Sequence, residues 1–260
     1  MKKYRFHLVR ILFLSLFSYL SFAAETLRVG MELAYPPFEM SDKNNKPTGI
    51  SVEIATALAE KLGKKLEIVN MSFDGLIPSL KTKKIDLILS SMTITEERKK
   101  TVDFSDGYVK TGLAVLANSN SSLQKAEDLD QKNIKIAVKK GTTGHIWATK
   151  NIKNAKVLLF DKENTAILEV TQAKVDAFLY DQMSVYRHWK DNQSGTRALL
   201  KPFQQEEWGI ALNPGQDTLK KQINEFLQDF RKKGGFDKLA DKYFKAEKKA
   251  FQDLGVGFIF

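Results

Sequence analysis

Short apolar segments alternate with amphipathic segments along the chain, and this alternation limits the possible folds more than any other feature. Strand-like segments over 27–31, 65–70 and 85–90 accompany a helical pattern over 50–62, whose apolar residues recur every four positions before a glycine. Repeated alternation of this kind is typical of a mainly parallel sheet with helices packed on its faces. The sequence therefore predicts an α/β fold.

The same alternation begins again in the second half of the chain. Its segments are alternately strand-like and helical, over 134–141, 143–151, 156–160, 163–174, 175–181 and 183–190. No Gly/Ser-rich linker separates the two series, so we expect two α/β units joined by short extended connections near 108–112 and 202–206. An amphipathic segment over 218–231 follows, and its periodicity does not say which unit it joins.

The N-terminal 24 residues have the pattern of a secretory signal peptide. Four basic residues precede or flank an apolar run over 8–20, and small residues follow up to Ala24. We predict cleavage near Ala24 and export of the mature chain. A retained membrane anchor is the alternative, but the run is shorter than the roughly 20 residues that span a bilayer.

Composition excludes several classes of function. Four of the 41 basic residues lie in the predicted signal peptide, and the chain also has 31 acidic residues. The remaining basic residues are spread along polar faces, many as Lys pairs, and form no nucleic-acid-binding motif. We therefore expect no nucleic-acid partner. The chain has no cysteine, which excludes a disulfide, a thiol nucleophile and a lipidated cysteine, so we expect a protein that is not a lipoprotein. With three histidines, one of them in the signal peptide, we expect neither a metal site nor a cofactor.

Polar side chains follow the apolar strand in "LILSSMTITEER". Ser90, Ser91 and Thr93 lie where ligands bind in open α/β sheets, beyond the carboxyl end of a strand, and Arg98 lies on the helix that follows. Arginine binds carboxylates through two parallel hydrogen bonds, so the segment has the features of a carboxylate receptor. The alternative is a helix cap in which Arg98 pairs with Asp103 or Asp106.

A counterpart occurs in the second unit. The segment "AVKKGTTG" ends a strand in a loop of glycines and threonines, and "FLYD" ends another strand in Asp181. A carboxylate at such a strand end can bind a ligand ammonium, although taken alone Asp181 fits better as the N-cap of the helix that begins at Gln182, a common use of Asp. Together the two units can hold both ends of a zwitterion between them.

Six segments resemble a known family in sequence and in order. They are "YPPFEM", "GISVEIATALAEKLG", "FDGLIPSLKTKKIDLILSSMTITEERKKTVDFSDGY", "AVKKGTTG", "DAFLYD" and "WGIAL". The resemblance is to the periplasmic polar amino-acid-binding proteins of ABC importers, solute-binding protein family 3, particularly the glutamine and the lysine/arginine/ornithine receptors. It runs from about Leu27 to Phe244, nearly the whole mature chain.

The resemblance implies a two-lobed α/β fold of the type II periplasmic-binding-protein kind, with a hinge and a ligand cleft between the lobes. The implied first lobe consists of residues 25–109 and 206–260, and the second lobe of residues 110–205. A membrane permease of an ABC importer is the implied partner, the implied location is the periplasm, and the implied oligomeric state is a monomer.

The resemblance also implies how the amino-acid group of a ligand is held. Arg98 would bind the α-carboxylate, with help from Thr93 and from the backbone N–H of Thr143. Asp181 would bind the α-ammonium, with the Ser91 carbonyl and Thr93 as further acceptors. Pairing both charges is required because an unpaired buried charge is costly.

Six further positions match the walls of the ligand site and the residues that select the side chain: Tyr35, Phe73, Glu32, Ser90, Lys139 and Tyr180. Lys139 matches the glutamine receptor, whereas Ser90 and Ser91 resemble the basic-amino-acid receptors. The position of Glu32 is usually Asp, and Tyr180 stands where the glutamine receptor has His. If Glu32 and Lys139 pair, a neutral amide fits best, so we expect glutamine first and arginine or lysine second.

Two other classes of function remain as alternatives. A periplasmic enzyme similar to cyclohexadienyl dehydratase uses the same fold, and Glu32 is the candidate general acid or base for it. The expected cleft has no His or Cys beside a nucleophile, so we expect a binding protein rather than an enzyme. A ligand-sensing subunit of a signalling receptor is the third alternative, and it requires a separate output partner.

Overall fold

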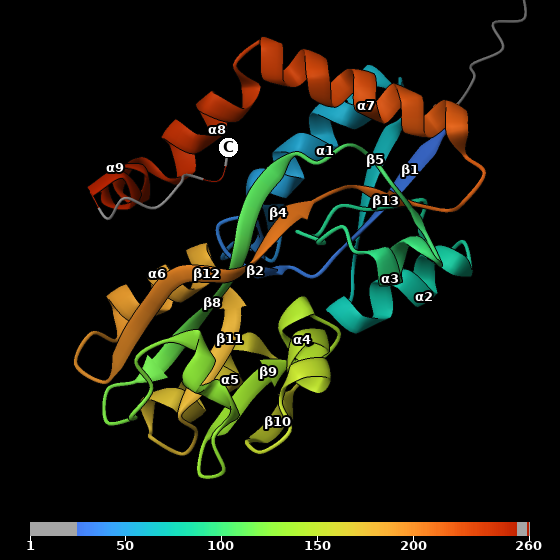
Figure 1. Cartoon of the computed structure of the whole chain (residues 1–260). Helices are drawn as coiled ribbons and strands as arrows, with labels where there is room; N and C mark the ends of the chain where they lie inside the picture. The colour runs from blue at the N-terminus through green and yellow to red at the C-terminus, as the bar shows by residue number, and fades with distance from the viewer. Residues whose placement is uncertain (1–24, 254–258, 260) are drawn as a thin grey trace, which may run out of the picture.

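The computed structural model describes residues 25–253 and 259, and it has two α/β lobes joined by two long strands (Figure 1). The predicted signal peptide, residues 1–24, lies outside these residues. None of the helices in the described part of the chain is long and apolar enough to cross a membrane.

The first lobe is built on a sheet with the strand order β5-β1-β6-β13-β7. Its strands are β1 (Thr26–Met31), β5 (Lys65–Asn70), β6 (Leu87–Ile88), β7 (Asp103–Phe104) and β13 (Ala211–Leu212). Strand β1 pairs in parallel with β5 and β6, while β13 lies antiparallel to β6 and β7. A segment from the last quarter of the chain therefore completes the first sheet.

Helix α1 (Ile50–Lys61) follows the predicted periodicity, because Ile50, Ile54 and Leu58 face the core and are fully buried. Gly49 precedes the helix with a φ of 118°, and a Cβ there would lie 2.4 Å from the Phe38 carbonyl oxygen, so this position requires glycine. The other helices of this lobe are η1 (Phe73–Gly75), α2 (Leu76–Lys81), α3 (Glu96–Lys99), α7 (Asp217–Lys232), α8 (Gly235–Tyr243) and α9 (Lys245–Asp253).

The second lobe contains a sheet with the strand order β10-β9-β11-β8-β12. Its strands are β8 (Val109–Asn118), β9 (Lys135–Lys139), β10 (Lys156–Phe160), β11 (Ala177–Asp181) and β12 (Thr196–Trp208). Its helices are η2 (Ala126–Asp130), α4 (Thr143–Asn151), α5 (Glu163–Thr171) and α6 (Gln182–Asp191). Helices α4 and α6 begin just beyond the carboxyl ends of β9 and β11, where the sequence predicts ligand-facing groups.

A small third sheet adds to the first lobe at the "YPPFEM" segment. It consists of β2 (Ala34–Tyr35), β3 (Glu39–Ser41) and β4 (Pro47–Thr48), all antiparallel. The small sheet buries the side chains of Tyr35 and Glu39.

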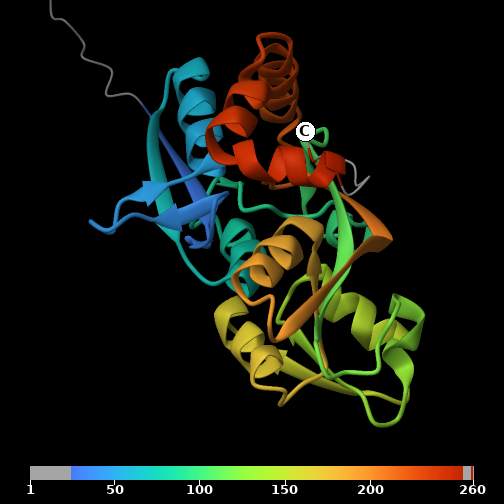
Figure 2. The same cartoon turned by 90° about the vertical axis from the view of Figure 1, so that its left-hand side faces the viewer.

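The two lobes are connected by β8 and β12, which pair antiparallel over nearly their full length. Segments 108–112 and 202–206, the expected connections, lie beside each other in this pair, where Gln205 is opposite Gly112 and Glu206 is opposite Thr111. The register shifts between Leu199 and Gln204. The connections are thus parts of long paired strands rather than separate linkers (Figure 2).

An apolar contact also joins the lobes on the side of the long strands. Met183 and Tyr186 of α6 belong to the same buried cluster as Phe251 of α9 and Ile259, and the Tyr186 and Phe251 ring centroids are 5.2 Å apart. The Lys110 N–H donates to the Ile259 carbonyl at 2.9 Å. We call this contact of Met183, Tyr186, Phe251 and Ile259 the apolar seam.

Candidate functional site

A cavity lies between the two lobes, and both lobes and the connecting strands contribute to it. The space in which the centre of a water-sized sphere fits is about 40 Å³, so the touching lobes leave a small cavity that is partly open to solvent. Its lining residues are Glu32, Tyr35, Glu39, Phe73, Ser90, Ser91, Thr93, Arg98, Leu113, Thr142, Thr143, Tyr180, Asp181, Glu206 and Trp208. Of the eleven residues that sequence analysis proposed, all but Lys139 line this cavity.

Arg98 extends from the short helix α3 toward both lobes and is 6% exposed. Its Nη1 donates to the Thr93 carbonyl at 2.6 Å, and its Nη2 donates to the Gly141 carbonyl of the second lobe at 3.0 Å. Burial lowers the pKa of Arg98 to about 10, so the side chain remains a cation at neutral pH. No ion pair of the described residues joins Arg98 to Asp103 or Asp106, the alternative partners.

Asp181 uses its two oxygens for two different contacts. Oδ1 accepts the Ser184 N–H at 3.0 Å and caps α6, while Oδ2 accepts the Tyr35 hydroxyl at 2.5 Å across the cleft. Burial raises the pKa of Asp181 from 3.8 to about 6, against the hydrogen bond from Tyr35. The capping contact and the exposure to the cavity, which sequence analysis treated as alternatives, therefore occur together.

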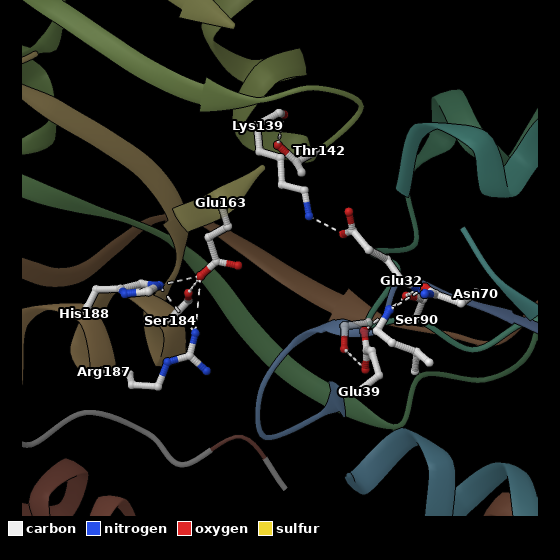
Figure 3. Close-up of polar contacts among 12 residues, drawn as sticks. Glu32, Glu39, Asn70, Ser90, Lys139, Thr142, Glu163, Ser184, Arg187 and His188 are labelled. Atoms are coloured by element: carbon white, nitrogen blue, oxygen red, sulfur yellow. Dashed lines mark hydrogen bonds and ion pairs between the residues drawn. The ribbon is translucent and has the colours of Figure 1, made fainter. Parts of the chain in front are cut away.

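Lys139 does not line the cavity, because its ammonium group pairs with the Glu32 carboxylate across the cleft (Figure 3). Its side chain is 2% exposed, so this ion pair is nearly removed from solvent. Phe73 lies beside two cations, with its ring centroid 5.5 Å from the Arg98 Cζ and 5.7 Å from the Lys139 Nζ. The Glu32–Lys139 ion pair, the Arg98 contact with Gly141 and the Tyr35 contact with Asp181 together show that the lobes touch across the cleft.

Glu39 is a cavity residue that sequence analysis missed. It is 1% exposed and accepts hydroxyl groups from Ser51 at 2.6 Å and from Ser90 and Ser91 at 3.1 Å each (Figure 3 draws the Ser90 contact). Burial raises its pKa from 4.5 to about 8, so this carboxyl is mainly neutral at pH 7. The sequence pattern that could have pointed to a buried carboxyl here is a single acidic residue directly after the apolar "YPPF".

Glu206, on the connecting strand β12, is the second missed carboxyl. Its Oε2 accepts the Thr93 hydroxyl at 3.0 Å, and its Oε1 accepts the Gln204 amide at 2.9 Å. Burial raises its pKa, while the Thr143 hydroxyl and the Arg98 charge act in the opposite direction. Residues 206 and 208 are buried while 207 is exposed. The alternation of side chains along a strand is therefore the sequence pattern that could have predicted an inward-facing Glu206.

A buried polar cluster supports Asp181 from the second lobe. The Glu163 Oε1 contacts the Ser184 hydroxyl at 2.5 Å, the His188 Nε2 at 2.6 Å and the Arg187 guanidinium at 3.3 Å (Figure 3). Burial raises the pKa of Glu163, but the His188 hydrogen bond and charge outweigh this and the net shift is downward. Through Ser184 this cluster fixes the start of α6, where Asp181 lies.

Two large side chains that follow the glycine and threonine loop, those of His145 and Trp147, lie outside the cavity lining. The His145 Nδ1 accepts the Gly141 N–H at 3.3 Å, and Trp147 packs against Phe203 with a centroid distance of 4.7 Å. Within the described ranges, no group of three or more His, Cys, Asp or Glu side chains is placed to hold a metal ion.

Sequence comparison places the chain among bacterial binding proteins. The profile of the family described as bacterial extracellular solute-binding proteins, family 3, matches residues 27–246. The L-cystine-binding protein TcyJ of Escherichia coli (strain K12) is 32% identical over 224 residues, which cover 85% of this chain and 84% of that protein. The L-arginine-binding protein of Pseudomonas aeruginosa is 33% identical over 247 residues, which cover 91% of this chain and 95% of that protein.

Solved structures agree with this placement. A mutant of ArgBP from T. maritima matches with a TM-score of 0.78 and 40% identity, covering 85% of this chain and 95% of that one. An ancestral arginine-binding protein, solved with arginine and with glutamine, matches at 40% identity with TM-scores of 0.78 and 0.77, covering 84% of this chain and 98% and 97% of those chains. AncCDT-1, an ancestral amino acid-binding protein and a precursor of cyclohexadienyl dehydratase, matches with a TM-score of 0.77 and 37% identity, covering 84% and 95%.

Proposed function

This chain belongs to the bacterial extracellular solute-binding proteins of family 3, and on that basis we propose that it captures a polar L-amino acid between its lobes and delivers it to an ABC importer. One observation carries the proposal: the cation Arg98 of the first lobe and the carboxylate Asp181 of the second lobe line the same cavity. These two charges match the α-carboxylate and the α-ammonium of an amino acid.

The amino-acid group would be held from both lobes. Arg98 binds the α-carboxylate with the Thr143 N–H at the start of α4, where free helix N–H groups favour an anion. Asp181 binds the α-ammonium with the Ser91 carbonyl and shares its carboxylate with the Tyr35 hydroxyl. Binding to the first lobe and closure of the second then form one population shift toward the closed receptor, which the importer recognises.

The Glu32–Lys139 ion pair supports glutamine as the first candidate ligand. The pair neutralises the two charges next to the predicted side-chain end of the site, so an uncharged amide meets no unpaired charge there. Tyr35 and Phe73 would pack on the aliphatic part of the ligand, and Ser90 and Tyr180 would contact its polar end.

Arginine or lysine is the second candidate, and Glu39 is the observation that favours it. This carboxyl lines the cavity and contacts only hydroxyl groups, with no ion pair among the described residues. A cationic side chain bound beside Glu39 would favour ionisation of this carboxyl and pair with it. The L-arginine-binding relative and the ancestral protein solved with both arginine and glutamine support keeping both candidates.

The proposal includes the organisation of the chain. Residues 1–24 would direct export to the periplasm and be removed, 25–109 and 206–260 would form the first lobe, and 110–205 would form the second. We propose a monomer that acts with a membrane permease and without nucleic acid.

A thermal-shift panel tests the proposed function. Residues 25–260 are unfolded, refolded to remove carried-over ligand, and heated with each common amino acid. A ligand at 100 times its dissociation constant should stabilise the protein by about 2.7 kcal/mol. A shift with glutamine or arginine supports the proposed receptor. No shift with any amino acid contradicts it, and the next assay is then for the activity of cyclohexadienyl dehydratase, the enzyme of which AncCDT-1 is a precursor.

Proton release distinguishes the two candidate ligands. At pH 7 Glu39 mainly holds its proton, because burial raises its pKa to about 8, and a nearby cationic side chain favours ionisation. Arginine binding should therefore release up to about one proton, whereas glutamine binding should release none from this group. Calorimetry in buffers of different ionisation enthalpy measures the difference, and Glu39→Gln should remove it. Equal proton release with both ligands would exclude Glu39 as the source.

A further inference from the structure

Glu206 contacts groups of both lobes, although it lies on the connecting strand β12. It accepts a hydrogen bond from the hydroxyl of Thr93, which follows β6 in the first lobe. A hydrogen bond from the hydroxyl of Thr143, in the second lobe, lowers the pKa of Glu206 against the effect of burial. Glu206 is 8% exposed and lines the cavity next to Arg98. The proposed function gives it no task.

The contact with Glu206 fixes the direction of the hydrogen bond at Thr93. An ionised carboxylate only accepts hydrogen bonds, and a hydroxyl has a single proton to donate. Donors reach both oxygens of Glu206, Thr93 at Oε2 at 3.0 Å and Gln204 at Oε1 at 2.9 Å, and these contacts oppose the burial that raises the pKa of Glu206. The proton of Thr93 is therefore directed at Glu206, and only lone pairs of the Thr93 oxygen face the cleft.

We propose that Glu206 is a positioning residue that determines which end of the amino acid Thr93 binds. By taking the Thr93 hydroxyl proton, Glu206 makes Thr93 an acceptor for the ligand α-ammonium and prevents it from donating to the α-carboxylate. This proposal rests on the proposed function and refines it, since it leaves Arg98 and the Thr143 N–H to bind the α-carboxylate.

The polarity of the site follows from this arrangement. Asp181 and Thr93, oriented by Glu206, then present acceptors to the ammonium, while Arg98 presents donors to the carboxylate. A ligand bound in the opposite orientation would place its carboxylate against the Thr93 lone pairs and near the negative Glu206. The ligand class is therefore α-amino acids with a free ammonium group, and deaminated analogues should bind measurably but more weakly.

A double-mutant cycle tests the proposal with L-glutamine and L-arginine as the probes. Glu206→Met, which keeps the approximate volume but has no strong acceptor, should weaken binding roughly ten- to hundredfold, the usual effect of a hydrogen bond to a charged group. Thr93→Val should cause a similar loss. The double variant should bind no more weakly than Thr93→Val alone, because Glu206 acts through Thr93.

A second readout separates positioning from a merely structural role. Removing the α-ammonium of glutamine gives 5-amino-5-oxopentanoate, and removing that of arginine gives 5-guanidinopentanoate. Glu206→Met should weaken the amino acids but not these analogues, so the preference of the receptor for the ammonium group should shrink. Glu206→Gln retains one accepting oxygen and should give an intermediate loss; it also replaces Glu206→Met in the cycle if that variant does not fold.

Glu207→Met is the matched control, because Glu207 is exposed on the same strand and faces away from the cavity. It removes the same charge and should leave affinity unchanged. Additive losses in the cycle, or equal losses for amino acids and deaminated analogues, would overturn the proposal. If the wild-type protein binds neither amino acid in the thermal-shift panel, it is the proposed function that fails, and this inference fails with it.

Discussion

Replacing Arg98 with alanine is expected to weaken amino-acid binding at least a hundredfold. In the proposed complex the guanidinium is the only cation that faces the α-carboxylate, since Lys139 is paired with Glu32. Removing one partner of a buried charge pair typically costs roughly 3–5 kcal/mol, because the other charge remains buried without compensation. Calorimetry of the variant with the ligand found in the thermal-shift panel measures the loss.

Two further variants make the Arg98 result specific. Arg197→Ala is a matched control, because Arg197 also donates to two backbone carbonyls, those of Ser121 and Leu123 at 2.8 Å each, but lies outside the cavity lining. It should bind normally. Arg98→Lys keeps a cation but loses the planar fork, so its affinity should lie between those of the wild type and Arg98→Ala. Near-wild-type affinity of Arg98→Ala would contradict the assignment of the carboxylate site.

Replacing Glu39 with glutamine is expected to stabilise the folded protein at alkaline pH, by an amount on the order of 3–5 kcal/mol. Burial raises the pKa of Glu39 from 4.5 to about 8, so between these values the folded state binds more protons than the unfolded state. The contribution of Glu39 to stability therefore falls as pH rises through this window. Glutamine is neutral throughout, which removes the cost of a buried carboxylate above pH 8.

Urea unfolding at pH 5, 7 and 9 measures this effect as the difference between Glu39→Gln and the wild type. The difference should favour the variant increasingly with pH, while groups common to both proteins, such as Asp181, cancel. Glu127→Gln is the control, because Glu127 is exposed in the second lobe and belongs to no ion pair of the described residues. A difference for Glu39→Gln that stays constant from pH 5 to pH 9 would show that its pKa is not raised.

Much of the cavity could be predicted from the sequence, because ligand groups in α/β folds lie at the carboxyl ends of strands. Ser90, Ser91 and Thr93 follow β6, and Asp181 ends β11, as their positions after apolar runs predicted. Arg98 also lies in the cavity, since the helix that carries it is short and begins close to the strand end. The two-lobed fold was confirmed by the solved relatives.

The residues that were missed depend on contacts that local patterns do not contain. Glu39 is buried by the pairing of β2, β3 and β4, strands of two or three residues that are too short to show a period. Glu206 faces the cavity because β12 continues past the second lobe and pairs with β8 at Thr111. The withdrawal of Lys139 from the cavity lining likewise depends on Glu32, which lies 107 positions away in the sequence and comes close only when the lobes meet.

The apolar seam determines where the axis of rotation between the lobes can lie. On the cleft side the lobes are held by polar contacts such as Tyr35 to Asp181 and Arg98 to Gly141, which exchange for water at a small net cost. On the opposite side, separating Tyr186 from Phe251 would expose apolar surface, at about 25 cal/mol for each Å². The least costly motion therefore keeps α6 and α9 together and turns the lobes about a line through the seam and the paired strands β8 and β12.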